Sequence, residues 1–533
     1  MINNKLNNPY QTVKNVHFAT NGMVATSQYL ASSAGIEILK QGGNAVDAAI
    51  ATAACLTVVE PTSNGIGGDA FALIWINDKL HGLNASGPAP KNISIKAIKE
   101  RGHSTMPTYG VLPVTVPGAV AAWATLSDRF GKLSLAQCLA PAISYAKNGY
   151  PISPVLGQNW ERSYKIFSEK LKGDEYQHWF DTFSTNNRPP SIGEIFKLPN
   201  HAKTLEEIGK TNGESFYHGN LANKIETFFT KHNGYLTKDD LKNFKPQWVN
   251  PISINYKGYD IWELPPNGQG IVALMALGIL KNFDYSNDAL YYHQQIESIK
   301  QSFATAKLTV TDIESMEFTI SDLLSENFLG KMQNNIKENA SVPAGIVPNK
   351  GGTVYLATAD NEGNMVSFIQ SNYMGFGSGI VIPGTGIAMQ NRGHDFSLDP
   401  SHINALEGGK RTYHTIIPGF ITKNNKPIGS FGVMGGYMQP QGHVQVISNL
   451  IDKGLSPQGA LDAPRWRWVK DNEIEVEHNF PISTAKQLSQ LGHKVTIKME
   501  SGDFGRGQII LRDEQGVMQG GCESRTDSSI SCW

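Results

Sequence analysis

The sequence predicts an α+β fold, a four-layer αββα sandwich with two stacked sheets between two layers of helices. Helical runs alternate with a few strand-like stretches before residue 350, whereas short alternating, β-branched runs dominate after residue 353. Strand-like runs in both parts are flanked by helical ones. They are therefore expected to share sheets that are covered by helices on both sides.

The first expected elements are two helices and a strand. A helical pattern starts at Ser27 and ends at the glycines of residues 42–43, which suit a helix C-terminus. Asn44 caps the next run, AVDAAIATAACLTVV, whose nearly all-apolar composition predicts full burial. A glycine-rich turn at residues 64–69 then leads into a strand, AFALIWI.

Helices are expected around residues 118–148, with Pro141 beginning a new helix because proline suits a first turn. Residues 150–250 are more polar and predict shorter helices. The run YKGYDIWELP reads as strand, and IVALMALGIL predicts a long apolar helix after the turn PPNGQG. A further short helix and a polar stretch are expected within residues 312–350.

After residue 353, short strands separated by turns are expected. They are VYLATAD, MVSFIQSN, GIVI, GIAMQ, TIIPGFIT and GSFGVMGG. Helices are expected at QVISNLIDKG and TAKQLSQLG. The strand that begins at Thr353 is expected to lie centrally in its sheet.

Composition excludes several classes of function. The chain has 533 residues and 46 Lys and Arg against 47 Asp and Glu, so no basic surplus favours nucleic acid or a membrane surface. No run approaches the ~18 apolar residues of a membrane span. The first 22 residues lack the apolar core of a secretory signal, so a cytoplasmic protein is expected.

The four cysteines have no metal-binding spacing. They are Cys55, Cys138, Cys522 and Cys532. Cys55 lies in an alanine-rich helical run and is expected to be a buried thiol. A Cys522–Cys532 bridge stays open, with free thiols the stronger expectation.

Thr353 is the leading candidate for a nucleophile, because it follows Gly351 and Gly352 at the head of a strand-like run. Self-cleavage requires its hydroxyl to attack the preceding carbonyl, and glycine permits the strained backbone that this needs. Cleavage leaves the hydroxyl beside an α-amine whose reference pKa of about 7.7–8.0 suits a base near neutral pH. Plain strand entry is the alternative, since a Gly-Gly-Thr run before a strand is common.

Four further segments join polar groups to turns. The pair Gly435–Gly436 after a strand can offer two N–H donors to an oxyanion, or form a simple tight turn. Residues 391–395 end a strand with packed polar groups, which fits substrate recognition or a solvated loop. Residues 410–415 place a hydroxyl and an imidazole together, and residues 371–373 precede a glycine-rich turn.

Cofactor and metal sites are disfavoured. The segment GFGSG has no glycine three residues after Gly377, as a dinucleotide-binding turn requires. A helix does not follow either, because the next run is GIVIP and Pro383 stops it. A metal site of His394, His414 and His443 with Asp395 lacks the spacing of zinc ligands. Neither a cofactor nor a metal is therefore expected.

A series of motifs in a fixed order carries a family resemblance. They are GGNAVDAAIA at 42–51, VVEP with NGIGGDAF at 58–71, VPGAVAAW at 116–123, LAPAISYAKNGYPIS at 139–153, ESFYHG at 214–219, ELPPNGQGI at 263–271, GGT at 351–353, FGSGIV at 376–381, DFS at 395–397, MGG at 434–436 and APRW at 463–466. Over about residues 20–510, the chain resembles the γ-glutamyltranspeptidase (glutathione hydrolase) family of N-terminal nucleophile hydrolases.

This resemblance implies a two-subunit enzyme and a set of site residues. Self-cleavage would give a large subunit, residues 1–352, and a small subunit, residues 353–533, which stay together as one folded unit; further dimerisation stays open. At matching positions, the resemblance implies roles for four kinds of residue: Thr353 as nucleophile, Gly435 and Gly436 as oxyanion-hole pair, Ser371 as support of the nucleophile, and Asp395 as partner of the substrate α-amine.

Several positions depart from the family pattern. Val354 and Tyr355 replace the hydroxyl residue and histidine that usually follow the nucleophile. At the substrate-binding positions the chain has Tyr373 for an asparagine, Arg392 for a glutamine or glutamate, and His414 and Thr415 for a pair of serines.

The family's carboxylate-binding arginine is also missing from residues 84–100, and the loop between Phe396 and Lys410 is short. Arg392 is a candidate to replace the lost arginine, since a guanidinium binds carboxylates bidentately. These departures resemble the branch of the family that includes oxamate amidohydrolase and cephalosporin acylase-like members.

The sequence therefore predicts an autoprocessed threonine amidohydrolase or acyltransferase that cleaves γ-glutamyl amides such as glutathione, by hydrolysis or by transfer to an amine. One alternative is an amidohydrolase for a non-γ-glutamyl amide, and the other is an unprocessed, silent scaffold. The expected partner is a small-molecule amide or γ-glutamyl peptide.

Overall fold

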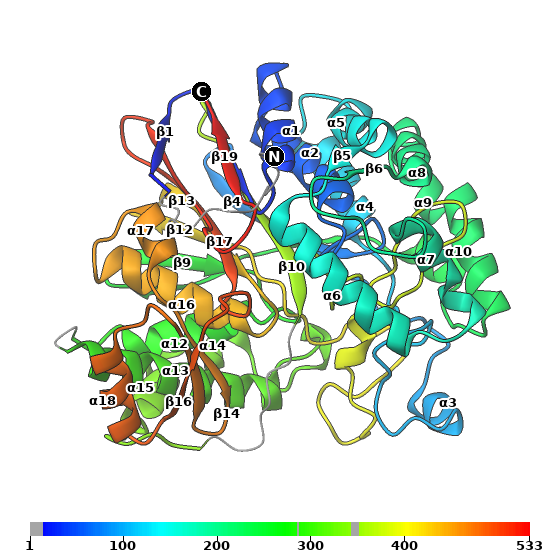
Figure 1. Ribbon diagram of the computed structural model, residues 1–533. Helices are drawn as coiled ribbons and strands as arrows, with labels where there is room; N and C mark the ends of the chain where they lie inside the picture. Colours follow the sequence, from blue (N-terminus) through cyan, green and yellow to red (C-terminus); the bar gives the residue numbers. More distant parts are fainter. Residues whose placement is uncertain (1–13, 285–286, 343–350) are drawn as a thin grey trace, which may run out of the picture.

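Two seven-stranded antiparallel sheets form the centre of the computed structural model, which describes residues 14–284, 287–342 and 351–533 (Figure 1). The first sheet has the order β1 (His17–Ala19), β18 (Met518–Cys522), β17 (Arg506–Arg512), β13 (Lys426–Met434), β12 (Gly419–Lys423), β9 (Tyr259–Glu263) and β8 (Ile252–Tyr256). The second has the order β19 (Ser529–Cys532), β2 (Gly22–Thr26), β10 (Gly352–Asp360), β11 (Met365–Tyr373), β3 (Asp69–Ile76), β4 (Lys79–Ala85) and β7 (Gln247–Val249).

Helices cover the outer face of each sheet (Figure 1). Against the second sheet and beyond it lie α1 (Tyr29–Lys40), α2 (Ala45–Val59), α4 (Ala119–Phe130), α5 (Leu135–Asn148), α8 (Pro199–Lys210), α9 (Glu214–Tyr217) and α10 (Asn220–Lys231). Against the first lie α12 (Gly270–Leu280), α13 (Asp288–Thr309), α15 (Glu326–Asn334), α16 (Met438–Ile451), α17 (Pro457–Asp462) and α18 (Ile482–Gln490). The predicted four-layer αββα sandwich is confirmed.

The remaining elements lie outside these four layers. They are α3 (Ile95–Glu100), α6 (Pro154–Lys170), α7 (Gln177–Phe183), α11 (Lys238–Asn243), α14 (Ile320–Leu323), the 3₁₀ turns η1 (Asp174–Tyr176), η2 (Ile313–Ser315) and η3 (Arg392–Asp395), the pair β5 (Tyr150–Pro151) and β6 (Ile195–Phe196), and the small sheet of β14 (Trp466–Lys470), β15 (Glu473–Glu477) and β16 (Lys494–Lys498).

The strand β10 is central, as predicted, because it pairs with β2 on one side and β11 on the other. Its side chains alternate between two cores. Tyr355 and Ala357 point into the core between the sheets, and Val354 and Leu356 point into the core under the helices around α2. Every residue of α2 is buried, as its apolar sequence predicts. Thr353 therefore enters a strand that is covered on both faces.

Two predictions of local structure were wrong. Pro141 does not begin a helix but lies inside α5, where its buried ring packs in the core and the lost backbone hydrogen bond is tolerated. The runs GIVI and GIAMQ do not form regular strands; they pair through an isolated bridge, Val381 to Ala388, with one backbone hydrogen bond on each side of it. Pro383 and the left-handed backbone of Gly379 and Gly384 interrupt a regular ladder there.

The four cysteines are free, which confirms the stronger expectation, and Cys55 is buried as predicted. Within the described parts of the chain, every helix is too short or too polar for a transmembrane span. The compartment predicted from the sequence stays a prediction.

Candidate active site

Thr353 is fully buried at the start of β10. Its Oγ1 lies 2.8 Å from the carbonyl oxygen of Gly352 and 3.2 Å from Ser371 Oγ. The ladder between β10 and β11 shifts register between Gly352 and Val354, so Thr353 occupies an irregularity in the strand pairing. The candidate nucleophile thus contacts the peptide that it would cleave.

Ser371 connects the same peptide to the neighbouring strand β11. Its hydroxyl donates to the Gly352 carbonyl oxygen at 2.7 Å and accepts from the Tyr373 N–H at 2.8 Å. A donor on a carbonyl oxygen draws electron density from the carbon and favours attack there. The geometry of Ser371 therefore fits the supporting role that the resemblance implies.

Gly435 and Gly436 lie between β13 and α16, beside the peptide of Gly351. A Cβ placed on Gly351 would come within 3.3 Å of Gly436 Cα. Both glycines have positive φ, 138° and 62°, so side chains there would be strained. The N-terminal end of α16, which begins at Met438, follows directly and favours negative charge nearby.

Two glutamines that carried no predicted role hold this region together. Gln269 Nε2 donates to the carbonyl oxygens of Gly436 at 2.9 Å and Thr415 at 2.6 Å. Gln439 Nε2 lies 3.4 Å from Thr353 Oγ1, and its Oε1 accepts from the Ile417 N–H at 3.0 Å. Their sequence signals were a glutamine in the turn PPNGQG before an apolar helix and one in the first helical turn after MGG.

Arg392, Asp395 and Tyr373 form one buried cluster. Asp395 Oδ1 accepts from the Tyr373 hydroxyl at 2.6 Å, and Oδ2 lies 3.4 Å from Arg392 Nη1. The guanidinium lies 4.0 Å over the Tyr373 ring, and Nη1 donates to Thr415 Oγ1 at 2.8 Å. Burial raises the pKa of Asp395, and the positive charge of Arg392 opposes that shift.

The remaining donors of Arg392 are unused. Its Nε and Nη2 are buried and have no hydrogen-bond partner among the residues that the structure describes. A buried guanidinium edge without a partner is unfavourable. A carboxylate is the group that would satisfy both donors at once.

His414 lies next to Thr415 but is engaged within the protein. Its Nε2 lies 3.1 Å from Asp69 Oδ2, and its Nδ1 accepts from the Ile416 N–H at 3.3 Å. Burial lowers the pKa of His414 well below its usual range and raises the pKa of Asp69 to about 7. Since both ring nitrogens are occupied, His414 forms part of the wall behind Thr415.

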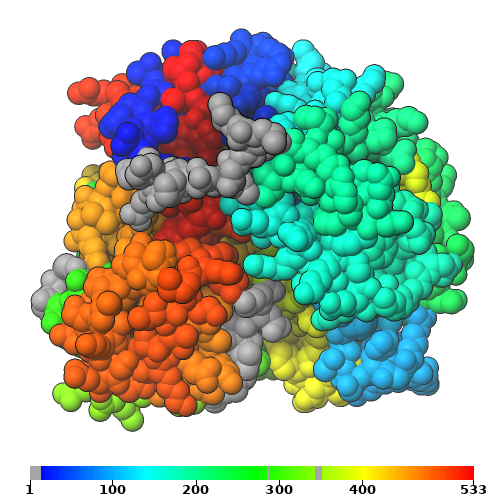
Figure 2. All heavy atoms as spheres, viewed as in Figure 1, coloured from blue at the N-terminus to red at the C-terminus, as the bar shows by residue number. Residues whose placement is uncertain are grey.

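A cavity of about 260 Å³ opens beside the Gly351–Gly352 peptide. Its walls come from α6, from the turn after β13 and from the segments around β14 and before β17; the charged residues among them are Arg162, Arg467, Asp503 and Arg506. In Figure 2, the cyan and orange lobes that carry α6 and β14 face each other across a recess.

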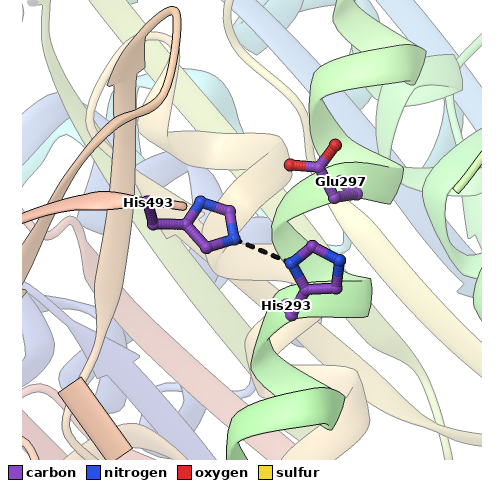
Figure 3. A group of neighbouring side chains, drawn as sticks. All are labelled: His293, Glu297 and His493. Atoms are coloured by element: carbon purple, nitrogen blue, oxygen red, sulfur yellow. Dashed lines mark hydrogen bonds between the residues drawn. The ribbon is translucent and has the colours of Figure 1, made fainter. Parts of the chain in front are cut away.

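The histidines of the rejected metal site have separate partners. His394 Nδ1 lies 2.9 Å from the Met106 carbonyl oxygen, and His443 Nδ1 lies 2.6 Å from Glu263 Oε1. Of the described residues, His293, Glu297 and His493 form a tighter group (Figure 3).

This group is explained by hydrogen bonds without an ion. His293 Nδ1 lies 2.8 Å from His493 Nε2, and its Nε2 lies 2.9 Å from the Lys337 carbonyl oxygen. Glu297 accepts from Lys300 Nζ at 2.7 Å and from the Ser341 N–H at 3.1 Å. Most of the ligand atoms are thus already bonded, and the group carries no metal assignment.

A threonine behind two glycines, at the head of a central strand of an αββα sandwich, defines the class of N-terminal nucleophile hydrolases. Comparison with known families agrees. The model of the γ-glutamyltranspeptidase family matches residues 31–533, and the chain therefore belongs to this family.

Its relatives include several kinds of amidohydrolase. A glutathione hydrolase-like proenzyme of Bacillus subtilis is 36% identical, over 96% of this chain and 98% of its own. The oxamate amidohydrolase proenzyme of Klebsiella pneumoniae is 32% identical, over 96% and 98%. The crystal structure of a cephalosporin acylase from Bacillus halodurans is 55% identical with a TM-score of 0.97, covering 100% of this chain and 99% of that one.

Proposed function

We propose that the chain is a self-cleaving threonine amidohydrolase whose substrate carries a carboxylate on its acyl half. In the first step, Thr353 Oγ attacks the carbonyl carbon of Gly352, the C–N bond breaks, and the proton passes to the new α-amine of Thr353. Water then hydrolyses the ester between Gly352 and Thr353. The contact of 2.8 Å between Thr353 Oγ1 and the Gly352 carbonyl oxygen supports this step.

The processed enzyme repeats the same chemistry on a substrate amide. The α-amine of Thr353 takes the hydroxyl proton while Oγ attacks the amide carbon, and it returns the proton to the leaving amine. The N–H groups of Gly435 and Gly436 stabilise the oxyanion, with the N-terminal end of α16 behind them. Water releases the acyl group from Thr353, and Gln439 orients the nucleophile through its contact with Oγ1.

The Arg392–Asp395 pair is the observation that carries the acyl preference. Both oxygens of Asp395 already have partners, so its charge is balanced inside the protein and is poorly available to an ammonium group. Arg392 still offers Nε and Nη2, which suits a second carboxylate. Amides of dicarboxylic acids therefore fit this site better than γ-glutamyl amides, which carry an α-amine as well.

A γ-glutamyl donor such as glutathione is the second candidate. Its support is Asp395 itself, which stands at the position where the family binds the donor α-amine. Such a donor would have to displace Arg392 from Asp395, at the cost of a buried ion pair.

A substrate panel tests the proposal. Processed protein is given oxamate, the monoamides of succinic and glutaric acids, and γ-glutamyl amides including glutathione. Butyramide is the uncharged control, because it lacks the carboxylate. We expect the highest kcat/KM among the dicarboxylic monoamides. Turnover confined to γ-glutamyl amides would reject the acyl preference in favour of the second candidate.

A further inference from the structure

Arg506 lies directly beside the glycine pair, at the first position of β17. It is the register partner of Met434, the last residue of β13. The preceding residue, Gly505, packs against the glycine pair as well, because a Cβ on Gly435 would lie 3.3 Å from Gly505 Cα. Arg506 also lines the cavity next to the Gly351–Gly352 peptide. The guanidinium of Arg506 thus lies in the wall of the cavity that also contacts the Gly351–Gly352 peptide.

The other charged groups of this cavity are balanced or exposed. Arg467 Nη2 lies 2.7 Å from Glu475, and its Nη1 lies 3.6 Å from Asp503. The side chain of Arg162 is 65% exposed, so water screens its charge.

Arg506 is different, because it is buried and incompletely paired. It is only 8% exposed, and its Nε has no hydrogen-bond partner among the residues that the structure describes. The carboxylate of Glu60 lies 3.9 Å from Nη1, beyond hydrogen-bond distance, and its other oxygen accepts from Ser27. Burial raises the pKa of Glu60 to about 7, so it is a partial countercharge near neutral pH. This environment favours an anionic ligand.

The two underpaired arginines are connected to different members of the glycine pair, Arg392 to Gly436 and Arg506 to Gly435. Arg392 reaches the pair through Thr415, which Gln269 links to Gly436. Arg506 reaches it from the side of Gly435. A substrate whose carbonyl oxygen is held by the pair, with its acyl half toward Arg392, therefore extends its amine half toward Arg506.

We propose that Arg506 binds a carboxylate on the amine half of the substrate, so that amides of amino acids are preferred over amides of neutral amines. This inference rests on the proposed function, since it deepens the description of that site on the leaving-group side. It predicts that the enzyme binds one substrate carboxylate on each side of the scissile bond.

The experiment compares glutaryl-glycine with glutaryl-glycinamide, which differ in the terminal carboxylate alone. We expect processed wild-type protein to favour glutaryl-glycine by about ten- to hundredfold in kcat/KM, as for a charge-assisted hydrogen bond. Arg506→Gln should bring the ratio of the two kcat/KM values close to one, and Arg506→Lys should keep part of it because the charge remains. Arg188→Gln, which removes an arginine that does not line the cavity, should keep the wild-type ratio.

A wild-type ratio near one overturns the inference without any variant. So does a wild-type ratio that survives in a processed Arg506→Gln protein. If neither glutaryl amide is cleaved but another acyl amide is, the acyl preference of the proposed function has failed. The same comparison of glycine with glycinamide on that acyl group then tests Arg506 separately.

Discussion

At the scale of single residues, Arg392 changes what Asp395 is able to bind. The sequence identifies Asp395 by its place in the DFS motif, and a free carboxylate there would suit an ammonium group. The structure instead shows that Tyr373 and Arg392 each take one of its oxygens. This could not be predicted from the sequence. It depends on the left-handed backbone of Tyr373, with φ of 74°, and on the 3₁₀ turn that brings Arg392 back to Asp395.

Arg392→Gln tests this residue. We expect kcat/KM for a glutaric monoamide to fall by about ten- to hundredfold, because the carboxylate loses its charge-assisted bonds. Turnover of a γ-glutamyl amide should fall less, because it loses the same carboxylate contact but its α-amine gains the freed Asp395. Steady-state kinetics on both substrates, with Arg392→Lys as the variant that keeps the charge, gives the comparison. An equal loss on butyramide would show that Arg392 merely maintains the structure.

Thr353 supports a second prediction at this scale. Thr353→Ala should remain a single chain without activity, and Thr353→Ser should process slowly because it keeps a hydroxyl. Denaturing gels and intact mass measurement follow the cut before residue 353, which gives fragments of 352 and 181 residues from the 533 of the chain. An intact wild-type chain with full activity would contradict the proposed nucleophile.

At the scale of elements, the site is assembled where β13 ends, α16 begins and the loop before α12 crosses them. Gln269 joins these parts through the carbonyl groups of Thr415 and Gly436. Strongly patterned elements such as α2 and β10 were predictable, since their burial follows a regular period. The role of Gln269 was not predictable. Its two hydrogen-bond partners, Thr415 and Gly436, lie 146 and 167 positions further along the chain, and no local sequence pattern indicates such contacts.

Gln269→Leu should therefore lower kcat more than it changes KM. The substitution leaves the buried Thr415 carbonyl without a donor, which costs about 1–3 kcal/mol. It also removes one of the two donors of the Gly436 carbonyl, which keeps only the Gln439 N–H at 3.1 Å. Processing rate on a denaturing gel and steady-state kinetics both report this loss. Gln490→Leu, at an exposed position at the end of α18, is the matched control. A normal kcat in Gln269→Leu would argue against a positioning role.

At the scale of the whole molecule, a buried histidine links folding to pH. His201 in α8 lies 3.0 Å from Thr57 Oγ1 and 3.3 Å from the Gly386 carbonyl oxygen, and burial lowers its pKa to about 4. Below the reference pKa of about 6.5, the unfolded chain binds a proton that the folded protein excludes. Stability is therefore lost as pH falls from about 6.5 toward about 4.

Urea titrations at several pH values measure this effect. We expect His201→Gln to reduce the dependence of the free energy of unfolding on pH by up to about 1.4 kcal/mol per pH unit in that range. Both proteins carry Thr353→Ala, so that a single chain unfolds. His478→Gln, at an exposed position, controls for the loss of one imidazole. Identical slopes with and without His201 would refute the assignment.

The interleaving of the sheets has a consequence for the thermodynamics of the cleaved protein. In one sheet β10 from the small fragment lies beside β2 from the large one, and in the other β12 lies beside β9. Cutting before Thr353 thus removes a peptide bond but none of these ladders, and the fragments should co-elute when native. Unfolding, however, releases two molecules instead of one.

Dilution consequently becomes a denaturing condition for the mature protein. By mass action, each tenfold drop in protein concentration should lower its apparent free energy of unfolding by about 1.4 kcal/mol, whereas uncleaved Thr353→Ala should be indifferent to concentration. Urea midpoints at several protein concentrations distinguish the two species. A concentration-independent midpoint for fully cleaved protein would mean that the fragments unfold independently, despite their shared sheets.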